Sequence, residues 1–449
     1  MADALQSTKD YELTVAVTAD RLGDTPVFIE NNVVELHIFE RMDMLFLTAQ
    51  MLIKDDLDMY NKIDFMGTEK VSIDIRHPSS DRIISKKFVV EQVERIRKVN
   101  DQVEMLSIRL IEQRGYDNFI SRFSKAYTGK PWIIMSKILT DQMGLTLNSY
   151  AAMEAQPEMR VVIPYLTVFE AVEMIRKRMA TTNGSPFFVY SPLNFDNIII
   201  KDLDTILKQP AWNTNGSNNR PFYFSSVRAN ATNNTPDDFE KQSYNIQSFV
   251  YRDVDNTLSM IKNGSVGSYN SFTDMTTGIT VGGHLDIEQT IDKINSEVLP
   301  TSKELKFDTA YLFKGDPITL YNSAYPHTLL SNNSYSDMKN LYHETDIGKL
   351  QLNATASTLT NLLFKNVVEI SIPGLHFITG QNKSIGQVIN IFFMSSDIAK
   401  ISINNVPEEE VKDKKKSGDY LIYSMRHVFT LGKHNVVAEA VKLRYDRGE

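Results

Sequence analysis

The sequence predicts a mainly β, α+β fold, in which two similar small β-barrel domains flank an α+β domain and a mixed segment is inserted. Three observations predict it. Apolar and polar residues alternate at both ends of the chain, apolar residues recur at helical spacing in the middle, and Asn, Pro, Gly and Ser gather at 209–236. We expect the first β domain at 1–113, the α+β domain at 114–205, the second β domain at 206–262 and 364–449, and the insertion at 263–363.

Composition restricts the class of protein. The chain has 449 residues, which favours about three domains, and no cysteine, which excludes disulfides and thiolate metal sites. Its formal net charge of −8 argues against a protein that grips nucleic acid, because such binding needs a surplus of Lys and Arg on one face. No apolar run approaches the ~20 residues that a membrane span needs, so we expect a soluble protein made in the cytoplasm.

The first β domain is predicted from alternation with the period of a half-buried strand. Leu13, Val15 and Val17 alternate with polar residues. The same pattern recurs at 34–38, 45–53, 71–75, 88–96 and 103–111. Turn residues at 77–81 and 99–101 separate neighbouring segments. Strands with such short connections favour a small barrel or sandwich.

Two helices and two short strands define the predicted α+β domain. Pro131 opens a helix that ends before Gly144, with proline in the first turn and glycine just past the end. Thr167 and Glu170 have the spacing of a capping box, and apolar residues follow at helical spacing as far as Met179. Short apolar strands are expected at 187–190 and 198–200.

Beyond the loop at 209–236, strands return toward the C-terminus. We expect strands at 222–224, 244–251, 367–372, 385–394, 420–429 and 436–445. We expect helices at 255–262, 287–297 and 345–363, with weak strands around Tyr311 and Ile318. The charged segment Asp413–Gly418 is interpreted as a solvated hairpin tip. A nucleic-acid patch is disfavoured because the run is short and has no interleaved aromatic residue.

The sequence contains no catalytic or cofactor-binding signature of the HExxH, GxSxG, Walker A or EF-hand type. His343 and Glu344 lack the second histidine of a zinc-binding helix. His427 and His434 could meet across a turn, but we interpret them as hydrogen-bonded or exposed histidines. The glycines of 264–283 do not match a phosphate cradle and predict a flexible loop.

Carboxylate pairs leave a second function open. Asp237 with Asp238, or Asp253 with Asp255, could serve a glycosidase, although their spacing does not show that they meet in space. Acidic pairs are common in loops, and only two Trp residues are present to form a sugar platform. We therefore expect no catalytic, cofactor-binding or metal-binding residue and no cofactor, with a cell-wall-degrading glycosidase as the alternative.

The strongest family signal lies in Ser417–Phe429, followed by Val436–Arg444. These residues resemble the last hairpin of hub and late-control proteins of contractile phage tails. Ile372–Leu375 and Thr379–Gln381 resemble the family's step into a strand of its second tube domain. Further resemblances lie at 33–75, 116–119, 131–144, 164–179 and 186–190. The pattern is similar to that of the central baseplate hub of T-even-like phages and, more distantly, to the VgrG base of type VI secretion spikes. The segment 264–345 departs from it.

The resemblance implies a structural role and no enzymatic activity. In this family two similar β tube domains per chain stand side by side, so that a homotrimeric ring is pseudo-sixfold on one face and threefold on the other. The implied partners are the other copies of the chain, a trimeric cell-puncturing spike, the sixfold tail tube or its initiator, and baseplate wedge proteins. DNA is expected to pass transiently through a neutral or acidic lumen, in a virion assembled from protein made in the host bacterial cytoplasm.

Overall fold

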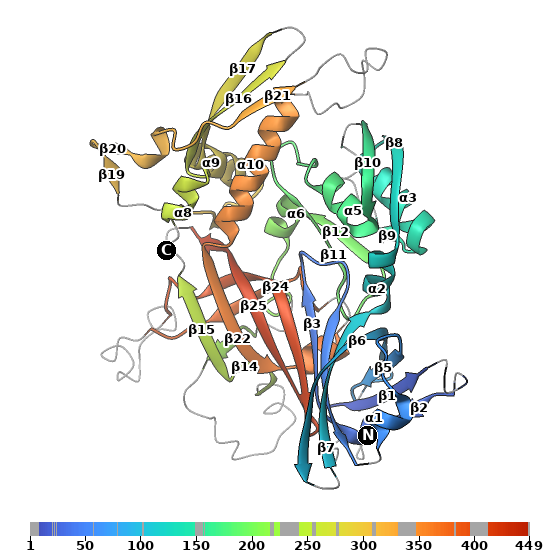
Figure 1. Cartoon of the computed structure of the whole chain (residues 1–449). Coiled ribbons are helices and arrows are strands. Elements are labelled where there is room, and N and C mark those ends of the chain that lie inside the picture. Colours follow the sequence, from blue (N-terminus) through green and yellow to red (C-terminus); the bar gives the residue numbers. More distant parts are fainter. Residues whose placement is uncertain are drawn as a thin grey trace, which may run out of the picture.

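The computed structural model describes most of the chain from Lys9 to Arg447. The described residues are 9–19, 21, 23, 25–56, 58–78, 80–100, 103–148, 156, 158–215, 220–224, 242–253, 257–274, 278–307, 311–330, 347–380, 383–395 and 412–447. Strands predominate at both ends of the chain, and most helices lie in the segment between them (Figure 1). This arrangement confirms the predicted mainly β, α+β fold.

The N-terminal region is a curved antiparallel sheet around an apolar core. Its elements are β1 (Glu12–Thr18), β2 (Val27–Phe28), η3 (Glu30–Asn32), β3 (Val33–Arg41), β4 (Thr48–Asp55), α1 (Met59–Ile63), β5 (Lys70–Arg76), β6 (Ile83–Asn100) and β7 (Val103–Glu112). The strands follow the order β3-β4-β7-β6-β5-β1-β2. The predicted alternation is confirmed, because Val15, Leu36, Met51, Ile73 and Leu106 are fully buried in one cluster.

The next region combines helices with short strands. Its elements are α2 (Gln113–Ile120), β8 (Arg122–Gly129), α3 (Pro131–Met143), β9 (Leu147–Asn148), β10 (Met159–Thr167), α5 (Val168–Arg176), β11 (Phe187–Tyr190), β12 (Ile198–Asp202) and α6 (Leu203–Lys208). The predicted capping box is present at the start of α5. Glu170 N–H donates to Thr167 Oγ1, and Thr167 N–H donates to the Glu170 carboxylate. α5 ends at Arg176, earlier than the predicted end at Met179.

The C-terminal strands and the segment between β15 and β22 share one apolar core. The strands and the short helix beside them are β13 (Phe222–Phe224), β14 (Asn245–Ile246), β15 (Ser248–Asp253), β22 (Asn366–Pro373), α11 (Leu375–Thr379), β23 (Val388–Phe392), β24 (Gly418–Thr430) and β25 (Lys433–Asp446). The segment between β15 and β22 contains α8 (Thr257–Lys262), β16 (Gly267–Asp274), β17 (Thr280–Asp286), α9 (Ile287–Glu297), β18 (Lys303–Glu304), β19 (Leu312–Phe313), β20 (Asp316–Pro317), η4 (Ile318–Leu320), β21 (His327–Leu330) and α10 (Ile347–Leu363). Ile291 of α9 and Leu359 of α10 lie in the same cluster as Ile370 and Tyr420 of the strands.

Several predicted elements of this part are confirmed and others are shorter. The helix predicted at 287–297 coincides with α9, and the one predicted at 345–363 is α10. The strand predicted at 385–394 is confined to β23. Around Tyr311 and Ile318 the chain forms the small hairpin β19–β20, and Ile318 itself begins η4.

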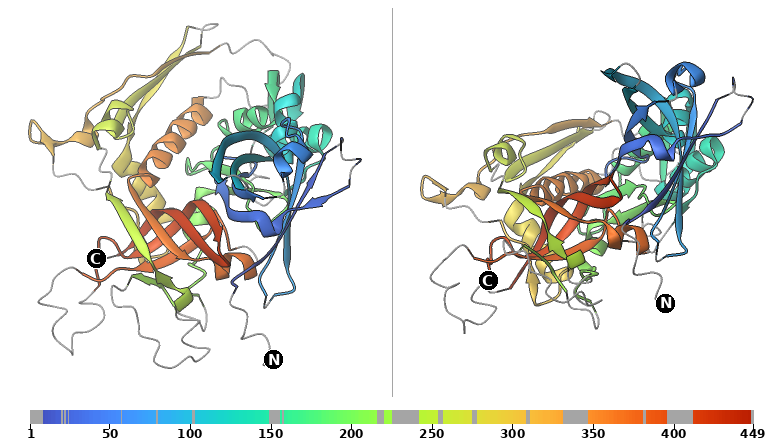
Figure 2. Two further views of the ribbon diagram at one scale, coloured as in Figure 1. Left: turned by 60° about the horizontal axis from the view of Figure 1, so that its bottom comes forward. Right: turned by 90° about the horizontal axis from the view of Figure 1, so that it is seen from below.

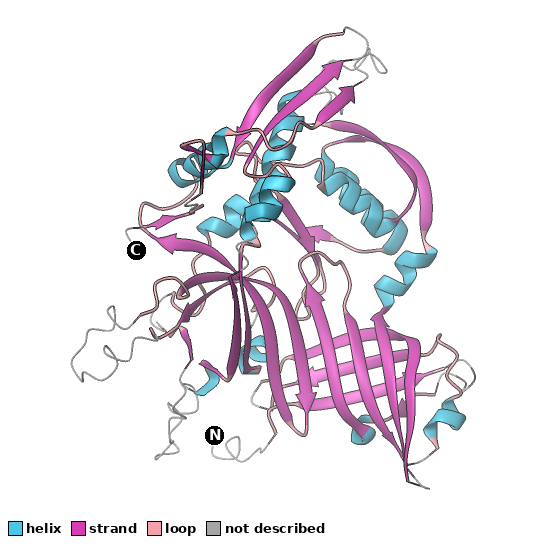
Figure 3. Ribbon diagram, turned by 60° about the vertical axis from the view of Figure 1, so that its left-hand side comes forward, coloured by secondary structure: helices cyan, strands magenta, loops and turns pink. Residues whose placement is uncertain are grey.

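Strands from both ends of the chain form one continuous sheet. β24 pairs with β3 antiparallel, with Ser424 opposite Arg41 and Thr430 opposite Glu35. The path through this pairing runs β15-β22-β25-β24-β3-β4-β7-β6, and every neighbouring pair along it is antiparallel. Figure 3 shows these strands side by side in one broad curved sheet.

The two ends repeat one strand order. Each end contributes a set of five strands, which we number by their order along the chain. Across the sheet, the first strand of each set is followed by the second, the fifth, the fourth and the third. The orders are β3-β4-β7-β6-β5 and β15-β22-β25-β24-β23, with antiparallel pairing throughout. The repetition agrees with the expectation that the two β regions are alike, while the predicted domain boundaries stay a prediction.

Candidate assembly surface

One face of the continuous sheet is polar across both β regions. Because residues directly opposite each other on neighbouring strands project to the same face, the register defines rows across the sheet. One such row is Pro373, Asn435, Val428, His37, Gln50, Arg109 and Gln92. These side chains range from half-buried to exposed. We call this face the polar face.

The opposite face of the same strands is buried. The adjacent row is Ile372, Val436, His427, Ile38, Ala49, Leu110 and Val90. Each of these residues is at most 1% exposed. A wall with one buried and one hydrated face is therefore continuous through the junction of β24 with β3.

Several cations on and beside the polar face are paired with carboxylates. Arg109 lies 2.5 Å from Glu94, and Arg252 lies 3.0 Å from Glu369. At the end of β3, Arg41 lies 2.6 Å from Asp43. Such pairs on an exposed surface contribute little to stability, but they neutralise cations that would otherwise bind phosphates.

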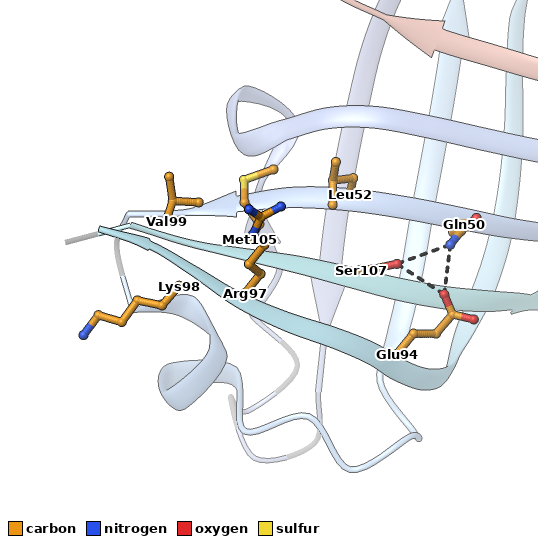
Figure 4. A pocket seen from close by; sticks show the side chains of 8 residues that line it. All are labelled: Gln50, Leu52, Glu94, Arg97, Lys98, Val99, Met105 and Ser107. Carbon is orange, nitrogen blue, oxygen red and sulfur yellow. Dashed lines mark hydrogen bonds between the residues drawn. The ribbon is translucent and has the colours of Figure 1, made fainter. Parts of the chain in front are cut away.

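A concave site of about 830 Å³ lies on the polar face where β6 runs past β5. It is lined by Gln50, Leu52, Glu94, Arg97, Lys98, Val99, Met105 and Ser107. Figure 4 shows Gln50 and Ser107 converging on the carboxylate of Glu94, to which Gln50 donates at 2.9 Å and Ser107 at 3.2 Å. The end of the site toward Arg97 and Val99 is formed by the tip of the β6–β7 hairpin.

A buried polar network lies behind the junction of the two β regions. Glu40, at the end of β3, accepts hydrogen bonds from Leu193 N–H at 2.7 Å and from Ser384 Oγ at 2.8 Å. Its carboxylate also lies 3.0 Å from His427 Nε2, and His427 Nδ1 lies 3.2 Å from His434 Nε2. Burial, with the neighbouring His427, holds the pKa of His434 well below its usual value. We call these five residues the junction network.

The junction network brings separate parts of the chain together. Glu40 belongs to the N-terminal strands, His427 and His434 to the C-terminal hairpin, and Leu193 to the loop after β11. Beside it, Arg82 donates to Gly380 O at 3.0 Å and also to Asn194 O. These contacts fix the angle at which the two β regions meet, because buried polar groups must keep their partners.

The structure brings together two of the residues that the sequence singled out. His427 and His434 are both buried and lie on neighbouring strands of one hairpin, where they meet each other as the sequence allowed. Sequence reasoning missed Glu40, which joins them from almost 400 residues away in the chain and carries no local signal. Among the described residues, no group of three or more His, Asp or Glu is placed to hold a metal ion.

The remaining candidates fall into two groups. His343, Glu344, Asp237, Asp238 and Asp255 lie outside the described residues, and of Asp253 only the backbone is described, as the last residue of β15. Phe222 is fully buried, as predicted for the strand 222–224.

Within the residues that the structure covers, no helix is both long and apolar enough to cross a membrane.

The prediction of a flexible loop at 264–283 is wrong for the part that the structure describes. Gly267 lies in β16, and Gly282 and Gly283 lie in β17, which pairs with β16. The reason is close packing of the backbone. A Cβ atom on Gly267 would lie 2.5 Å from Tyr321 O, so only glycine fits this strand position.

His376, in the C-terminal region, is expected to make the stability of the fold depend on pH. It lies in α11, where Ser243 Oγ is 2.8 Å from its Nε2 atom and the rings of Trp212, Phe222 and Tyr244 surround it. Burial, with the charge of Lys383, lowers its pKa from 6.5 to about 4.

Stability is therefore expected to fall as the pH falls below 6.5. The unfolded chain takes up a proton on His376 in this range, whereas the folded chain does not until about pH 4. By pH 5 the loss from this residue should reach about 2 kcal/mol. Urea unfolding at pH 7 and pH 5 tests it, since the variant His376→Leu should lose about 2 kcal/mol less than the natural chain. Equal losses would contradict the assignment.

The fold is similar to those of known proteins. No protein-family model matches the chain, and no curated protein matches it. Its structure is similar to the 43 kDa tail protein of prophage MuSo2 from Shewanella oneidensis, with a TM-score of 0.53 and 10% identity over 96% of this chain and 99% of that chain. A tail protein from Neisseria meningitidis MC58 has a TM-score of 0.49 and 11% identity over 96% of each chain. A type VI secretion component from E. coli has a TM-score of 0.41 and 8% identity over 91% of this chain and 73% of that one.

The likeness to the MuSo2 tail protein shows a shared fold over nearly the full length of both chains. The fold of this chain is therefore that of a phage tail protein. The resemblance to tail proteins seen in the sequence is confirmed at this level.

Proposed function

We propose that this chain is the structural hub of a contractile phage baseplate and not an enzyme. Three copies form a ring that joins the sixfold tail tube to the trimeric cell-puncturing spike. The observation that carries the proposal is the strand order β3-β4-β7-β6-β5, which recurs as β15-β22-β25-β24-β23 within one continuous sheet. A chain with two like modules side by side gives six modules from three copies, which matches a sixfold partner on one face and a threefold partner on the other.

The polar face is suited to line the lumen of that ring. It is hydrated across both β regions, and its cations Arg109 and Arg252 are held by carboxylates. The expectation of a neutral or acidic lumen is thus refined to a surface of mixed, locally paired charge. Pairing of these two cations with carboxylates weakens their attraction for phosphates, which favours passage of DNA without retention.

The proposal assigns the protein a place and partners. It belongs to the tail baseplate of the virion, is made in the host bacterial cytoplasm, and contacts the spike, the tail tube or its initiator, and baseplate wedge proteins. The fold shared with a phage tail protein supports this placement.

The proposal predicts a trimer of three times the 51.2 kDa chain mass. Light scattering on the purified full chain, alone and mixed with the trimeric spike protein of the same tail, measures this directly. A chain that stays monomeric at every concentration, with and without the spike, would rule the ring out.

The alternative of a cell-wall glycosidase gains no support from the described residues. Of its two carboxylate pairs, only Asp253 falls within them, and there only as backbone at the end of β15. No described observation favours this activity over the structural role.

A further inference from the structure

We propose that the edge of β6 over Gln92–Asn100 pairs antiparallel with the edge of β15 in a second copy of the chain. This contact would repeat, between molecules, the β24–β3 junction that the structure shows within one molecule. The inference rests on the proposed trimeric hub and specifies which strands close its ring. Figure 2 shows β6 and β15 on opposite sides of the β24–β3 junction, as a head-to-tail ring requires.

β6 is the counterpart of β24. Each strand leads into a hairpin with a two-residue loop, since Asn100 lies opposite Val103 and Thr430 opposite Lys433. Each also carries an extra, bulged residue at the same place when the residues of its partner strand are counted from the loop. β6 has two further bulged residues nearer the loop, Glu94 and Val99, so the register is counted on β7. The bulge at Glu91 precedes the pair Gln92–Arg109, and the bulge at Tyr423 precedes the pair Ser424–Glu439. Arg109 lies six residues after Val103, the first residue of β7, and Glu439 lies six residues after Lys433, the first residue of β25. Arg109 and Glu439 are therefore equivalent positions.

In β24, the edge that faces away from its hairpin partner pairs with two different strands, one along each half. We compare this edge with the corresponding edge of β6. The first part of β24, Gly418–Leu421, pairs with β23, and the last part, Ser424–Thr430, pairs with β3. The first part of β6, Ile83–Val89, pairs with β5. Its last part, Gln92–Asn100, has no strand on this edge among the described residues. The position that β3 fills beside β24 is therefore open beside β6.

β15 is the counterpart of β3. His37 of β3 lies opposite Gln50, which lies opposite Arg109. Val250 of β15 lies opposite Glu369, which lies opposite Glu439. Because Arg109 and Glu439 are equivalent, His37 and Val250 are equivalent too.

β15 also has an open edge. It pairs with β22 on one side, and no described strand lies on its other side. Val250 is 54% exposed. An exposed strand edge of this kind presents unpaired backbone donors and acceptors, which a matching edge would satisfy.

The internal junction fixes the register of the proposed contact. Val428 lies opposite His37 in the β24–β3 pair, and its counterpart in β6 is Arg97. Arg97 is therefore expected opposite Val250 of the second copy, on the polar face beside the concave site. The same register places Arg95 opposite Arg252, and the charge of Arg252 is offset by Glu369 of its own chain, which lies 3.0 Å from the guanidinium.

A disulfide tests this register. Met42 N–H donates to Tyr423 O, which makes the Arg41–Ser424 position, and by alternation His37–Val428, a non-hydrogen-bonded pair. In such pairs the Cα atoms lie about 4.5 Å apart, within the range of about 4.4–6.8 Å that a disulfide spans. The natural chain has no cysteine, so every disulfide formed must join introduced thiols.

In the full chain carrying Arg97→Cys and Val250→Cys, mild oxidation should link molecules into dimers and closed trimers on a non-reducing gel. The chain with His37→Cys and Val428→Cys serves as the positive control, because the equivalent bond must close within each monomer. The chain with Arg97→Cys and Arg252→Cys serves as the register control. A shift of two residues separates the positions by about 7–8 Å, so it should link far less.

Light scattering on the same samples separates this inference from the proposed function. Trimers whose Arg97→Cys and Val250→Cys thiols stay unlinked, while the internal control closes, would overturn the strand pairing and leave the hub ring standing. Equal linking of the register control would also overturn it. A monomer in every sample would overturn both.

Discussion

Replacing Glu40 by alanine is expected to lower the free energy of unfolding by roughly 3–5 kcal/mol, the range for removing one partner from a buried charged network. Leu193 N–H, Ser384 Oγ and the His427 ring would all lose the same acceptor. Leu193 N–H, Ser384 Oγ and the Nε2 atom of His427 then lose their acceptor while buried, which costs more than the hydrogen bonds themselves contributed. Urea unfolding followed by circular dichroism measures the loss.

Two variants test the cause of that effect. Glu35→Ala removes a carboxylate from the same strand on the polar face, where Glu35 contacts His37 at 2.7 Å, and should cost less than about 1 kcal/mol. His427→Leu added to Glu40→Ala removes a stranded polar ring and should restore part of the loss. Similar effects of Glu40→Ala and Glu35→Ala would show that the junction network does not stabilise the fold.

Replacing Arg444 by methionine is expected to cost a similar amount, roughly 3–5 kcal/mol. Arg444 is 5% exposed and donates from Nε to Asp419 Oδ2 at 2.9 Å. Its other nitrogens donate to Leu207 O and Gln209 O, which ties the end of α6 to the C-terminal hairpin. Burial opposes ionisation of Asp419, but the charges of Lys303 and Arg444 outweigh it and hold the pKa of that carboxyl below its usual value.

The matched control for this change is Arg447→Met near the end of the same hairpin. Arg447 is about half exposed and lies 3.9 Å from Glu304, so its loss should cost at most about 1 kcal/mol. Asp419→Asn in the Arg444→Met chain removes a buried charge that has lost one of its two cationic partners, so it should recover part of the stability. An Arg444→Met chain that unfolds at the same urea concentration as Arg447→Met would contradict the prediction.

Local signals in the sequence predicted individual elements well. The capping box at Thr167 and Glu170 fixed the start of α5, and apolar spacing predicted α9 at its observed bounds. Alternation predicted the N-terminal strands because it reports which side chains face a core. These signals act over a few residues, which is why they can be recognised in a single sequence.

The arrangement of those elements depends on contacts that leave no local signal. The pairing of β24 with β3 joins residues almost 400 positions apart, and alternation in each strand does not say which edges meet. Alternation also did not predict the length of β6. The last part of β6 extends beyond the end of β5 and pairs there only with β7. The glycines of 264–283 suggested mobility, whereas Gly267 is needed for close packing against Tyr321.

The candidate surface was predictable in part. The two-residue loop Leu431–Gly432 sets the register of the last hairpin, and that register places His427 and His434 on one face. A sequence pattern can therefore bring the two rings together, as we considered. It does not supply Glu40, Ser384 or Leu193, which come from three other parts of the fold.

Closure of the β24–β3 junction within one polypeptide affects how such a ring would come apart. Contacts inside a chain form as that chain folds and do not weaken when the protein is diluted, whereas contacts between chains do. In a ring that alternates the two kinds, half of the joints are insensitive to concentration. Dilution would then release whole chains, each carrying its eight-stranded sheet, and would not release a single β region. The ring would therefore lose its β regions two at a time.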